Sequence, residues 1–458
     1  MRDIENTTPI YDLKSEPEKS EKSELDLGGE IERDLDDARG SISGDNPGDG
    51  TDLEDAGPPD GGAAAWLVVL GAWCCSFCSF GWVNSVGSFQ QYYEVGPLKD
   101  YSTSTIAWIP SLQFFCMFGL GPVVGVLFDK YGPKPLIIGG TLLHVFGLMM
   151  ASLATTYYQF ILSQGVCSAI GAACLFSPAL ACLSTWFSKK RGVAMGITAT
   201  GSSVGGVIFP IMISRMIQTT GYPWAMRTGA FVILGLQIVA ILTVRPRMKS
   251  VPQKMPAGRF AAPFKEFPFV MLLLGMCVLA YGIFIPIDYL ASQGFQEAHL
   301  SEEMAQYLVS IFNGASLFGR LASGYGADII GRWNIFIIAC TLSGIAEFAV
   351  WIPAKQPSIT IGFAIMFGFS SGAFIGLAGA LPISVSPMPE IGYRLGMAFL
   401  AMAIPALTMA PIGGAILQSS ANGWLDVKIF GGVMCLAGSV IILVSRLLYT
   451  EKKLLKVF

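Results

Sequence analysis

Charged residues are scarce in this chain, because Asp, Glu, Lys and Arg together make up only 13% of its 458 residues. A soluble protein normally carries about 25%, since its surface must face water. Hydrophobic residues make up 53% of the chain. This composition excludes an ordinary soluble fold and indicates that most of the exterior faces lipid.

Histidine is nearly absent, because the chain contains only His144 and His299. Two histidines are too few to support a histidine-based metal site, and they give little basis for a catalytic triad. Cys75 and Cys78 have C-x-x-C spacing, which we interpret as packing of small apolar residues on a membrane helix. The chain also lacks the Gly-x-x-x-x-Gly-Lys-[Ser/Thr] loop that binds nucleotide phosphates. We expect no metal, no cofactor, no enzyme activity and no nucleic-acid partner.

Acidic residues are concentrated at the N-terminus, where residues 1–60 hold 19 Asp and Glu against 6 Lys and Arg. Few large apolar residues accompany them, so this segment cannot bury enough apolar surface to offset the entropy of ordering. It also lacks the basic start and apolar core of a cleaved signal. We predict a disordered acidic cytoplasmic tail at 1–60.

Apolar stretches recur along the rest of the chain, each close to the roughly 20 residues that a helix needs to cross a bilayer core of about 30 Å. We predict an all-α membrane protein with twelve transmembrane helices. Six form a bundle at 61–246 and six at 267–450, with a basic cytoplasmic linker at 247–266 and a short tail at 451–458. Lys and Arg gather in one set of loops, which places both termini in the cytoplasm.

The two halves contain a repeated element, which follows the second and the eighth predicted spans. Its matched residues are separated by the same offset and are Gly125, Asp129 and Gly132 in the first half and Gly324, Asp328 and Gly331 in the second. A shared offset at three positions indicates an internal repeat. The repeat therefore predicts two related six-helix halves.

This Gly-x-x-x-Asp-x-x-Gly element resembles the cytoplasmic loop motif of the major facilitator superfamily. Asp60-Gly61-Gly62 before the first span resembles a signature of its monocarboxylate porter family, fungal branch. The segment 186–191, Trp-Phe-Ser-Lys-Lys-Arg, resembles a second signature, which opens the fifth span. The resemblance covers about 61–450 and implies the major facilitator fold and a secondary carrier.

Charged residues at the predicted cytoplasmic helix ends are candidates for a gate. Acids beside cations there could pair across helices, hold the inner side shut and separate when it opens; charges placed for topology alone are the alternative. The candidate gating residues are Asp129, Lys130, Asp328, Arg332, Lys190 and Arg191.

Arg320 is the main candidate for substrate binding. It lies eight residues before Asp328, about 12 Å along a helix, and so well inside the hydrocarbon region. An intramembrane Arg costs at least about 2.5–3.5 kcal/mol on insertion scales. We expect it to face a cavity and bind an acidic group of the substrate, with a protein acid or helix carbonyls as alternative partners. The other candidate substrate-binding residues are Ser316, Asn84, Asp288, Gln113, Phe284 and Phe374.

The chain departs from the family at two charged positions. Proton-coupled members use a Lys in the first span and an Asp four residues before an Arg in the eighth; these positions fall on Asn84 and Ser316 here. The departure leaves proton coupling open and favours a larger organic substrate over a short monocarboxylate. Asp288 and Glu347 are alternative proton carriers or partners of Arg320. For Glu347 a structural role is the favoured interpretation.

The expected function is secondary active transport of a small organic, anionic molecule by alternating access, with export of a secondary metabolite as the leading interpretation. Import of a nutrient or vitamin-like organic acid is the alternative, and a non-transporting membrane sensor is a second class. The expected partners are the substrate and the lipid bilayer, and an accessory subunit stays open. We expect a multi-pass protein of the plasma membrane, with the vacuolar membrane as the alternative.

Overall fold

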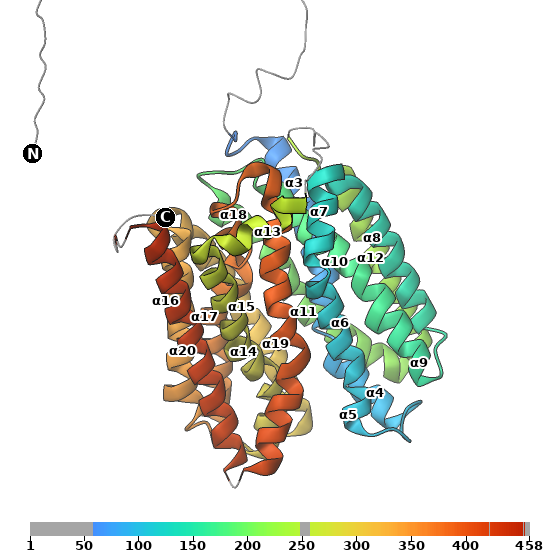
Figure 1. Ribbon diagram of the computed structural model, residues 1–458. Helices are drawn as coiled ribbons and strands as arrows, with labels where there is room; N and C mark the ends of the chain where they lie inside the picture. The colour runs from blue at the N-terminus through green and yellow to red at the C-terminus, as the bar shows by residue number, and fades with distance from the viewer. Residues whose placement is uncertain (1–57, 248–256, 421, 452, 454–458) are drawn as a thin grey trace, which may run out of the picture. The chain divides into compact units, whose positions relative to one another are not determined.

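The computed structural model describes residues 58–247, 257–420, 422–451 and 453. Most of the expected tail at 1–60 and the middle of the expected linker at 247–266 lie outside these residues. All regular structure in the described part of the chain is helical (Figure 1). The all-α prediction is therefore confirmed for the residues that can be described.

The first half contains the helices α3 (Ala63–Ser76), α4 (Val86–Val95), α5 (Thr103–Ile106), α6 (Trp108–Gly119), α7 (Gly121–Tyr131), α8 (Pro133–Ala151), α9 (Tyr157–Phe160), α10 (Ala169–Leu183), α11 (Arg191–Thr219) and α12 (Tyr222–Thr243). The short helix α13 (Ala257–Lys265) follows within the expected linker. The second half contains α14 (Phe267–Gln296), α15 (Glu302–Ile330), α16 (Arg332–Ala346), α17 (Pro357–Leu377), α18 (Ala380–Ser384), α19 (Ile391–Ser419) and α20 (Gly423–Tyr449).

Eleven helical segments among the described residues are long and apolar enough to cross a membrane. The remaining expected span corresponds to α15, which has 29 residues but is less apolar. Its buried side carries Asn313, Ser316 and Arg320, whereas Phe318 and Tyr325 on the other side are 64% and 66% exposed. Polar side chains on the protein-facing side lower the mean hydropathy of this helix, although its exposed side carries large apolar residues.

The first predicted span is not one continuous helix. After α3 the chain forms a wide π-helical turn over Phe77–Gly81, and the helix is interrupted at Asn84 and Ser85 before α4 begins. Gly81 packs against α11, where an added Cβ atom would lie 2.7 Å from the Cα atom of Gly205. Irregular backbone at membrane depth is tolerated where it is buried in protein or lines a cavity. The interrupted segment at Asn84 and Ser85 must therefore face the protein interior rather than lipid.

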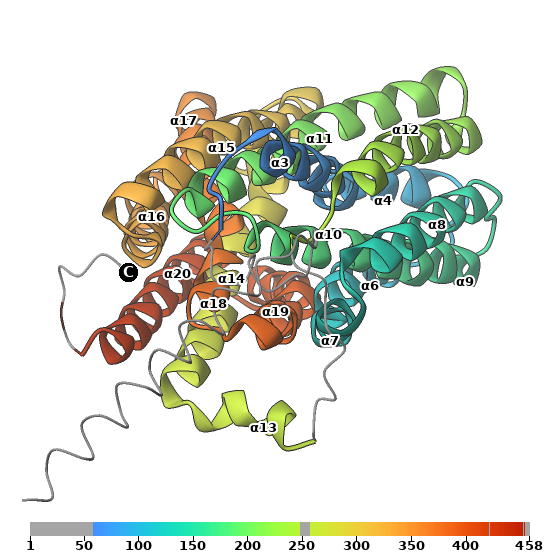
Figure 2. The ribbon, with the colours of Figure 1, turned by 90° about the horizontal axis from the view of Figure 1, so that it is seen from above.

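The most extensive contacts between the halves are made by α11 and α19. α11 packs against α15, and α19 packs against α6 and α7, as Figure 1 and Figure 2 show. α11 belongs to the first half and α19 to the second, and each contacts helices of the other half. The repeat seen in the sequence therefore corresponds to two equivalent contacts between the halves.

The repeated glycines have the same backbone role in each half. Gly132 ends α7 with φ 74° and Gly331 ends α15 with φ 105°. These left-handed conformations favour glycine, because other residues meet a Cβ clash there. The matched glycines thus end both helices at the same distance, three residues after Asp129 and Asp328.

Candidate functional site

Asp328 joins the end of α15 to the start of α11. Its Oδ1 accepts a hydrogen bond from the backbone N–H of Gly192 at 2.7 Å, and its Oδ2 accepts one from Val193 at 2.8 Å. N–H groups in the first turn of a helix have no partner within the helix, and the helix dipole favours a negative charge there. A carboxylate of the second half therefore caps a helix of the first.

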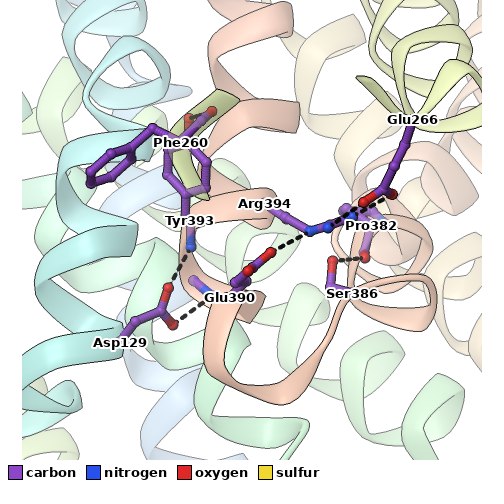
Figure 3. A network of polar contacts seen from close by, with 9 residues as sticks. Asp129, Phe260, Glu266, Pro382, Ser386, Glu390, Tyr393 and Arg394 are labelled. Atoms are coloured by element: carbon purple, nitrogen blue, oxygen red, sulfur yellow. Dashed lines mark hydrogen bonds and ion pairs between the residues drawn. The ribbon is translucent and has the colours of Figure 1, made fainter. Parts of the chain in front are cut away.

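Asp129 makes the equivalent contact in the opposite sense. Its two carboxylate oxygens each accept a hydrogen bond at 2.8 Å from the backbone N–H groups of Gly392 and Tyr393, at the start of α19 (Figure 3). A carboxylate of the first half thus caps a helix of the second. The two halves cap one another reciprocally.

Glycines allow these helices to approach so closely. A Cβ atom added to Gly392 would lie 2.5 Å from the carbonyl oxygen of Gly125, and one added to Gly192 would lie 2.6 Å from that of Gly324. Side chains cannot be accommodated at such distances without moving the backbone. We refer to these as the α7–α19 contact (Asp129, Gly125, Gly392) and the α11–α15 contact (Asp328, Gly192, Gly324).

Two of the predicted gating cations lie at the α11–α15 contact. An Nη2 atom of Arg332 is 3.9 Å from Oδ1 of Asp328 and also donates to the carbonyl oxygen of Ser188. Arg191 donates from Nε to the carbonyl oxygen of Phe187 at 3.0 Å. Arg332 therefore binds the opposite half, as expected of a gating cation, whereas this bond of Arg191 stays within its own half.

The other two predicted cations have local partners. The ammonium of Lys130 lies 4.8 Å from the centroid of the Tyr131 ring, and Lys190 donates its backbone N–H to Asp60 at 3.1 Å. The structure thus brings the expected acids to the junction of the halves, but their closest recorded partners are helix-start amides.

A cavity of about 370 Å³ lies between the two halves. Residues from α4, α6, α14, α15, α17, α19 and the first span line it, and they are Phe80, Val83, Asn84, Glu94, Phe114, Phe284, Ile287, Asp288, Ala291, Ser292, Val309, Phe312, Asn313, Arg320, Ile375, Ala406 and Met409. Its size and mostly apolar wall with a few polar groups are typical of a site for a small organic molecule.

Arg320 lies in the cavity wall and reaches across to the first half. Its Nη1 donates to the carbonyl oxygen of Ala199 at 2.6 Å and to Oγ of Ser202 at 2.5 Å, both on α11. Its Nε is buried without a hydrogen-bond partner, and no ion pair to Arg320 is recorded among the described residues. A buried donor without a partner carries a desolvation cost. An acidic group that accepts a hydrogen bond from Nε would remove this cost, so the guanidinium can still bind such a group.

The remaining predicted substrate-binding residues divide into two groups. Asn84, Asp288 and Phe284 line the cavity. Gln113, Ser316 and Phe374 do not, and they are 0%, 0% and 2% exposed. Phe374 packs behind Phe284 with ring centroids 6.0 Å apart, and the polar side-chain atoms of Gln113 and Ser316 are buried without partners.

Two further polar candidates lie away from the cavity. Glu347 is fully buried in a π-helical turn that continues α16. His144 is fully buried and bridges two other π-helical turns, with Nε2 3.1 Å from the carbonyl oxygen of Cys78 and Nδ1 2.9 Å from Oγ of Ser168. Wide turns leave carbonyl groups free to accept such bonds, so His144 is a packed contact between helices.

Sequence reasoning missed Asn313, which lines the cavity with Phe312. Asn313 lies three residues before Ser316 and seven before Arg320. Residues at these spacings share one face of a helix, so the spacing could have identified it. The aromatic wall residues Phe80 and Phe114 carry no comparable signal, because most Phe residues of a membrane helix face lipid.

The fold and this central cavity define a helical membrane protein of two halves, and the comparisons give its family. The model of the Major Facilitator Superfamily matches residues 69–298, which is half of the chain. The chain is also 68% identical over 450 residues to the "Fujikurins efflux protein" of Gibberella fujikuroi, covering 98% of this chain and 97% of that protein. The chain therefore belongs to the Major Facilitator Superfamily and is a multi-pass membrane transporter.

Other curated relatives have similar names. The "MFS transporter asaE" of Aspergillus flavus is 54% identical, covering 87% of this chain and 90% of the relative. The "Aspyridones efflux protein apdF" of Emericella nidulans is 41% identical, covering 84% and 78%.

Solved structures support the fold. The transporter FucP "in the outward conformation" matches with a TM-score of 0.66 at 13% identity, covering 83% of this chain and 99% of that one. The human organic anion transporter MFSD10 matches with a TM-score of 0.65 at 13% identity, covering 83% and 98%. At these identities the likeness shows the fold alone.

Proposed function

We propose that this transporter exports an acidic secondary metabolite by alternating access, and that Arg320 binds the acidic group. The observation that carries the proposal is the guanidinium in the wall of a cavity between the halves, with Nε buried and unbonded. Curated relatives named as efflux proteins for fujikurins and aspyridones support the direction and the kind of substrate. The cavity volume and apolar wall favour a molecule larger than lactate or pyruvate.

The proposed topology has twelve spans with both termini in the cytoplasm, and α15 is the eighth. A helix of 29 residues is about 43 Å long, enough to cross a hydrocarbon core of about 30 Å. Lys and Arg concentrate at the end where α7 and α15 finish, which favours a cytoplasmic location for that end. In this topology the α7–α19 and α11–α15 contacts form the inner gate, and the cavity faces outward.

The proposed subfamily is the monocarboxylate porter family, and the proposed location is the plasma membrane. The two elements resembling its signatures lie in contact, because Asp60 accepts a hydrogen bond from the N–H of Ser188 at 2.7 Å. A carrier that exports its substrate directly from the cytoplasm to the outside must lie in the plasma membrane, which favours that membrane over the vacuolar one. Fluorescent tagging of the full chain would test the location.

The substrate can be found by comparing metabolites inside and outside cells that lack or overexpress the chain. We expect one acidic compound to accumulate inside deletion cells and outside overexpressing cells. With that compound, Arg320→Ala should raise the KM for transport at least about tenfold, the loss of one charge-assisted hydrogen bond. Arg320→Lys keeps the charge but not the planar donor set, so it should have an intermediate effect.

Arg215→Ala is the matched control, because Arg215 is exposed on α11 and outside the cavity wall. It should leave KM unchanged. Normal KM in Arg320→Ala at equal surface expression would contradict the substrate role of Arg320. An unchanged metabolite distribution in deletion cells would contradict export itself.

A further inference from the structure

The segment before α3 is fastened to the loop before α11 by one carboxylate. Asp60 accepts hydrogen bonds at Oδ1 from the backbone N–H groups of Ser188, at 2.7 Å, and Lys190, at 3.1 Å. Its own N–H donates to the carbonyl oxygen of Trp186 at 3.2 Å. Segments 128 residues apart are thus joined by three hydrogen bonds at one residue.

The backbone around Asp60 is shaped for this attachment. Asp60 has φ 53°, a left-handed conformation that is uncommon for a residue other than glycine, although Asp adopts it more readily than most. Four residues into α3, the Trp66 ring packs 5.3 Å from the ring of Phe187, which is 0% exposed. A strained residue persists where its surroundings hold it, so the surrounding contacts hold Asp60 in place.

Asp60 and Asp328 serve the same helix start. Lys190 directly precedes α11, and Asp60 takes the N–H groups of Ser188 and Lys190. Asp328 accepts hydrogen bonds from the N–H groups of Gly192 and Val193, in the first turn of α11. One carboxylate from each half therefore binds the amides around a single helix N-terminus, where unpaired N–H groups and the helix dipole both favour anions.

The start of α19 is arranged differently. Asp129 caps it from the opposite half, but the nearby carboxylates Glu390 and Glu266 bind the side chain of Arg394. Among the described residues, no second carboxylate is recorded on the backbone N–H groups that begin α19. The second carboxylate therefore distinguishes the start of α11 from that of α19.

We propose that Asp60 is a positioning residue for the α11–α15 contact. It holds the loop at 188–190 so that the N–H groups of Gly192 and Val193 face Asp328. It also remains bound to the first half when Asp328 withdraws, so that the start of α11 keeps its shape for the next closure. This role rests on the alternating access of the proposed function, but its test requires no substrate.

A cysteine in the contact can report its opening. Ala327 is 2% exposed, and its Cβ lies 2.9 Å from where a Cβ on Gly192 would be. The full chain carrying Ala327→Cys is treated in membranes with a polar maleimide, and labelling of the same chain without this substitution is subtracted. Asp60→Ala should raise the labelling rate about fivefold, as for the loss of one helix N-terminal cap.

Three matched variants separate positioning from general damage. Gly61→Ala should change nothing, because an added Cβ meets no atom within 4 Å there. Asp60→Asn keeps the acceptor oxygen and should change labelling less than about twofold, since Asn caps nearly as well as Asp. Asp60→Glu keeps the charge but displaces the carboxylate by one methylene, so it should raise labelling, and it replaces Asp60→Ala if that variant fails to reach the membrane.

A double substitution gives the decisive comparison. In an Asp328→Ala background the contact has lost its carboxylate, so Asp60→Ala should add less than about twofold. Unchanged labelling in Asp60→Ala, or a full repeat of its effect in the Asp328→Ala background, would overturn the proposal. Rapid full labelling of Ala327→Cys with Asp60 intact would instead show that the closed contact does not form, which contradicts the proposed inner gate.

Discussion

The α7–α19 and α11–α15 contacts share one design and differ in what supports it. Both place a carboxylate on a helix N-terminus above a pair of glycines. The α11–α15 contact also includes Arg320, which binds α11 through Ala199 and Ser202, and Asp60. The two contacts therefore share the same arrangement of carboxylate, helix N-terminus and glycines, but different residues support each of them.

The α7–α19 contact is supported by the linker between the halves. Arg394 makes two hydrogen bonds to Glu266, at 2.7 and 2.6 Å, and one to Glu390 at 3.0 Å (Figure 3). The hydroxyl of Tyr393 donates to the carbonyl oxygen of Phe260 in α13 at 3.0 Å. One contact is thus tied to the linker and the other to the cavity.

This difference predicts how an anion bound at Arg320 would affect the two contacts. Arg320 and Asp328 lie on the same helix and both bind α11. An anion that draws the guanidinium of Arg320 into the cavity would remove its bonds to Ala199 and Ser202, and would therefore loosen the α11–α15 contact first.

The largest effect is expected from a methyl group between the paired glycines. In Gly392→Ala the new Cβ would lie 2.5 Å from the carbonyl oxygen of Gly125, and in Gly192→Ala it would lie 2.6 Å from that of Gly324. Overpacking of this kind costs about 1–3 kcal/mol, so both should lower the transport rate about tenfold or more. Gly139→Ala is the control, because an added Cβ meets no atom within 4 Å there. A normal rate in only one of the two would show that the contacts are not equivalent.

The next effect concerns Arg394, whose side chain is 4% exposed between two carboxylates. Arg394→Gln should lower the free energy of unfolding by about 1–2 kcal/mol, less than a fully buried pair because Glu266 is 40% exposed. Arg332→Gln should cost less, because its ion-pair distance to Asp328 is 3.9 Å. Thermal unfolding of the purified protein in detergent measures both, with the exposed Lys265→Gln as a control. Equal losses would contradict the stronger tie to the linker.

Much of the site could be predicted from local sequence. The repeated glycine and aspartate positions were identified from their shared offset, and Arg320 from its depth in a membrane helix. The amide partners of Asp129 and Asp328 could not be, because they lie 263 and 136 residues away and a backbone N–H has no sequence signature. The position of α15 was predicted, but a hydropathy criterion alone misses it because its polar side faces protein.

The cavity was less predictable than the contacts. Its wall is assembled from seven elements, and Asn84 enters it only because the first span is interrupted there. Gln113 and Ser316 have the same polar character but are buried behind the wall. Which face of a helix meets the cavity depends on packing between the halves, and no local sequence pattern shows that packing.

A smaller effect is expected from the two capping carboxylates. Asp129→Asn and Asp328→Asn each remove a charge from a helix start, which contributes about 0.3–1 kcal/mol. The first should lower transport about two- to fivefold. The second should lower it less, because Asp60 still holds the start of α11. Asp100→Asn, in an exposed loop, is the control for loss of an acid, and a larger loss in Asp328→Asn than in Asp129→Asn would contradict a supporting role for Asp60.

The smallest expected effect tests the linker alone. Tyr393→Phe keeps the ring that packs 5.4 Å from Phe260 but removes the hydroxyl bond to its carbonyl oxygen, a loss of about 1 kcal/mol. Hydrogen exchange of the α13 amides should become about fivefold faster, with transport changed less than about twofold. Tyr281→Phe, which removes a hydroxyl bonded to Thr408, should leave α13 unchanged. Unaltered exchange in Tyr393→Phe would mean that the ion pairs of Arg394 alone hold the linker. The α7–α19 contact would then be tied to the linker by one residue, Arg394, rather than by a network that includes Tyr393.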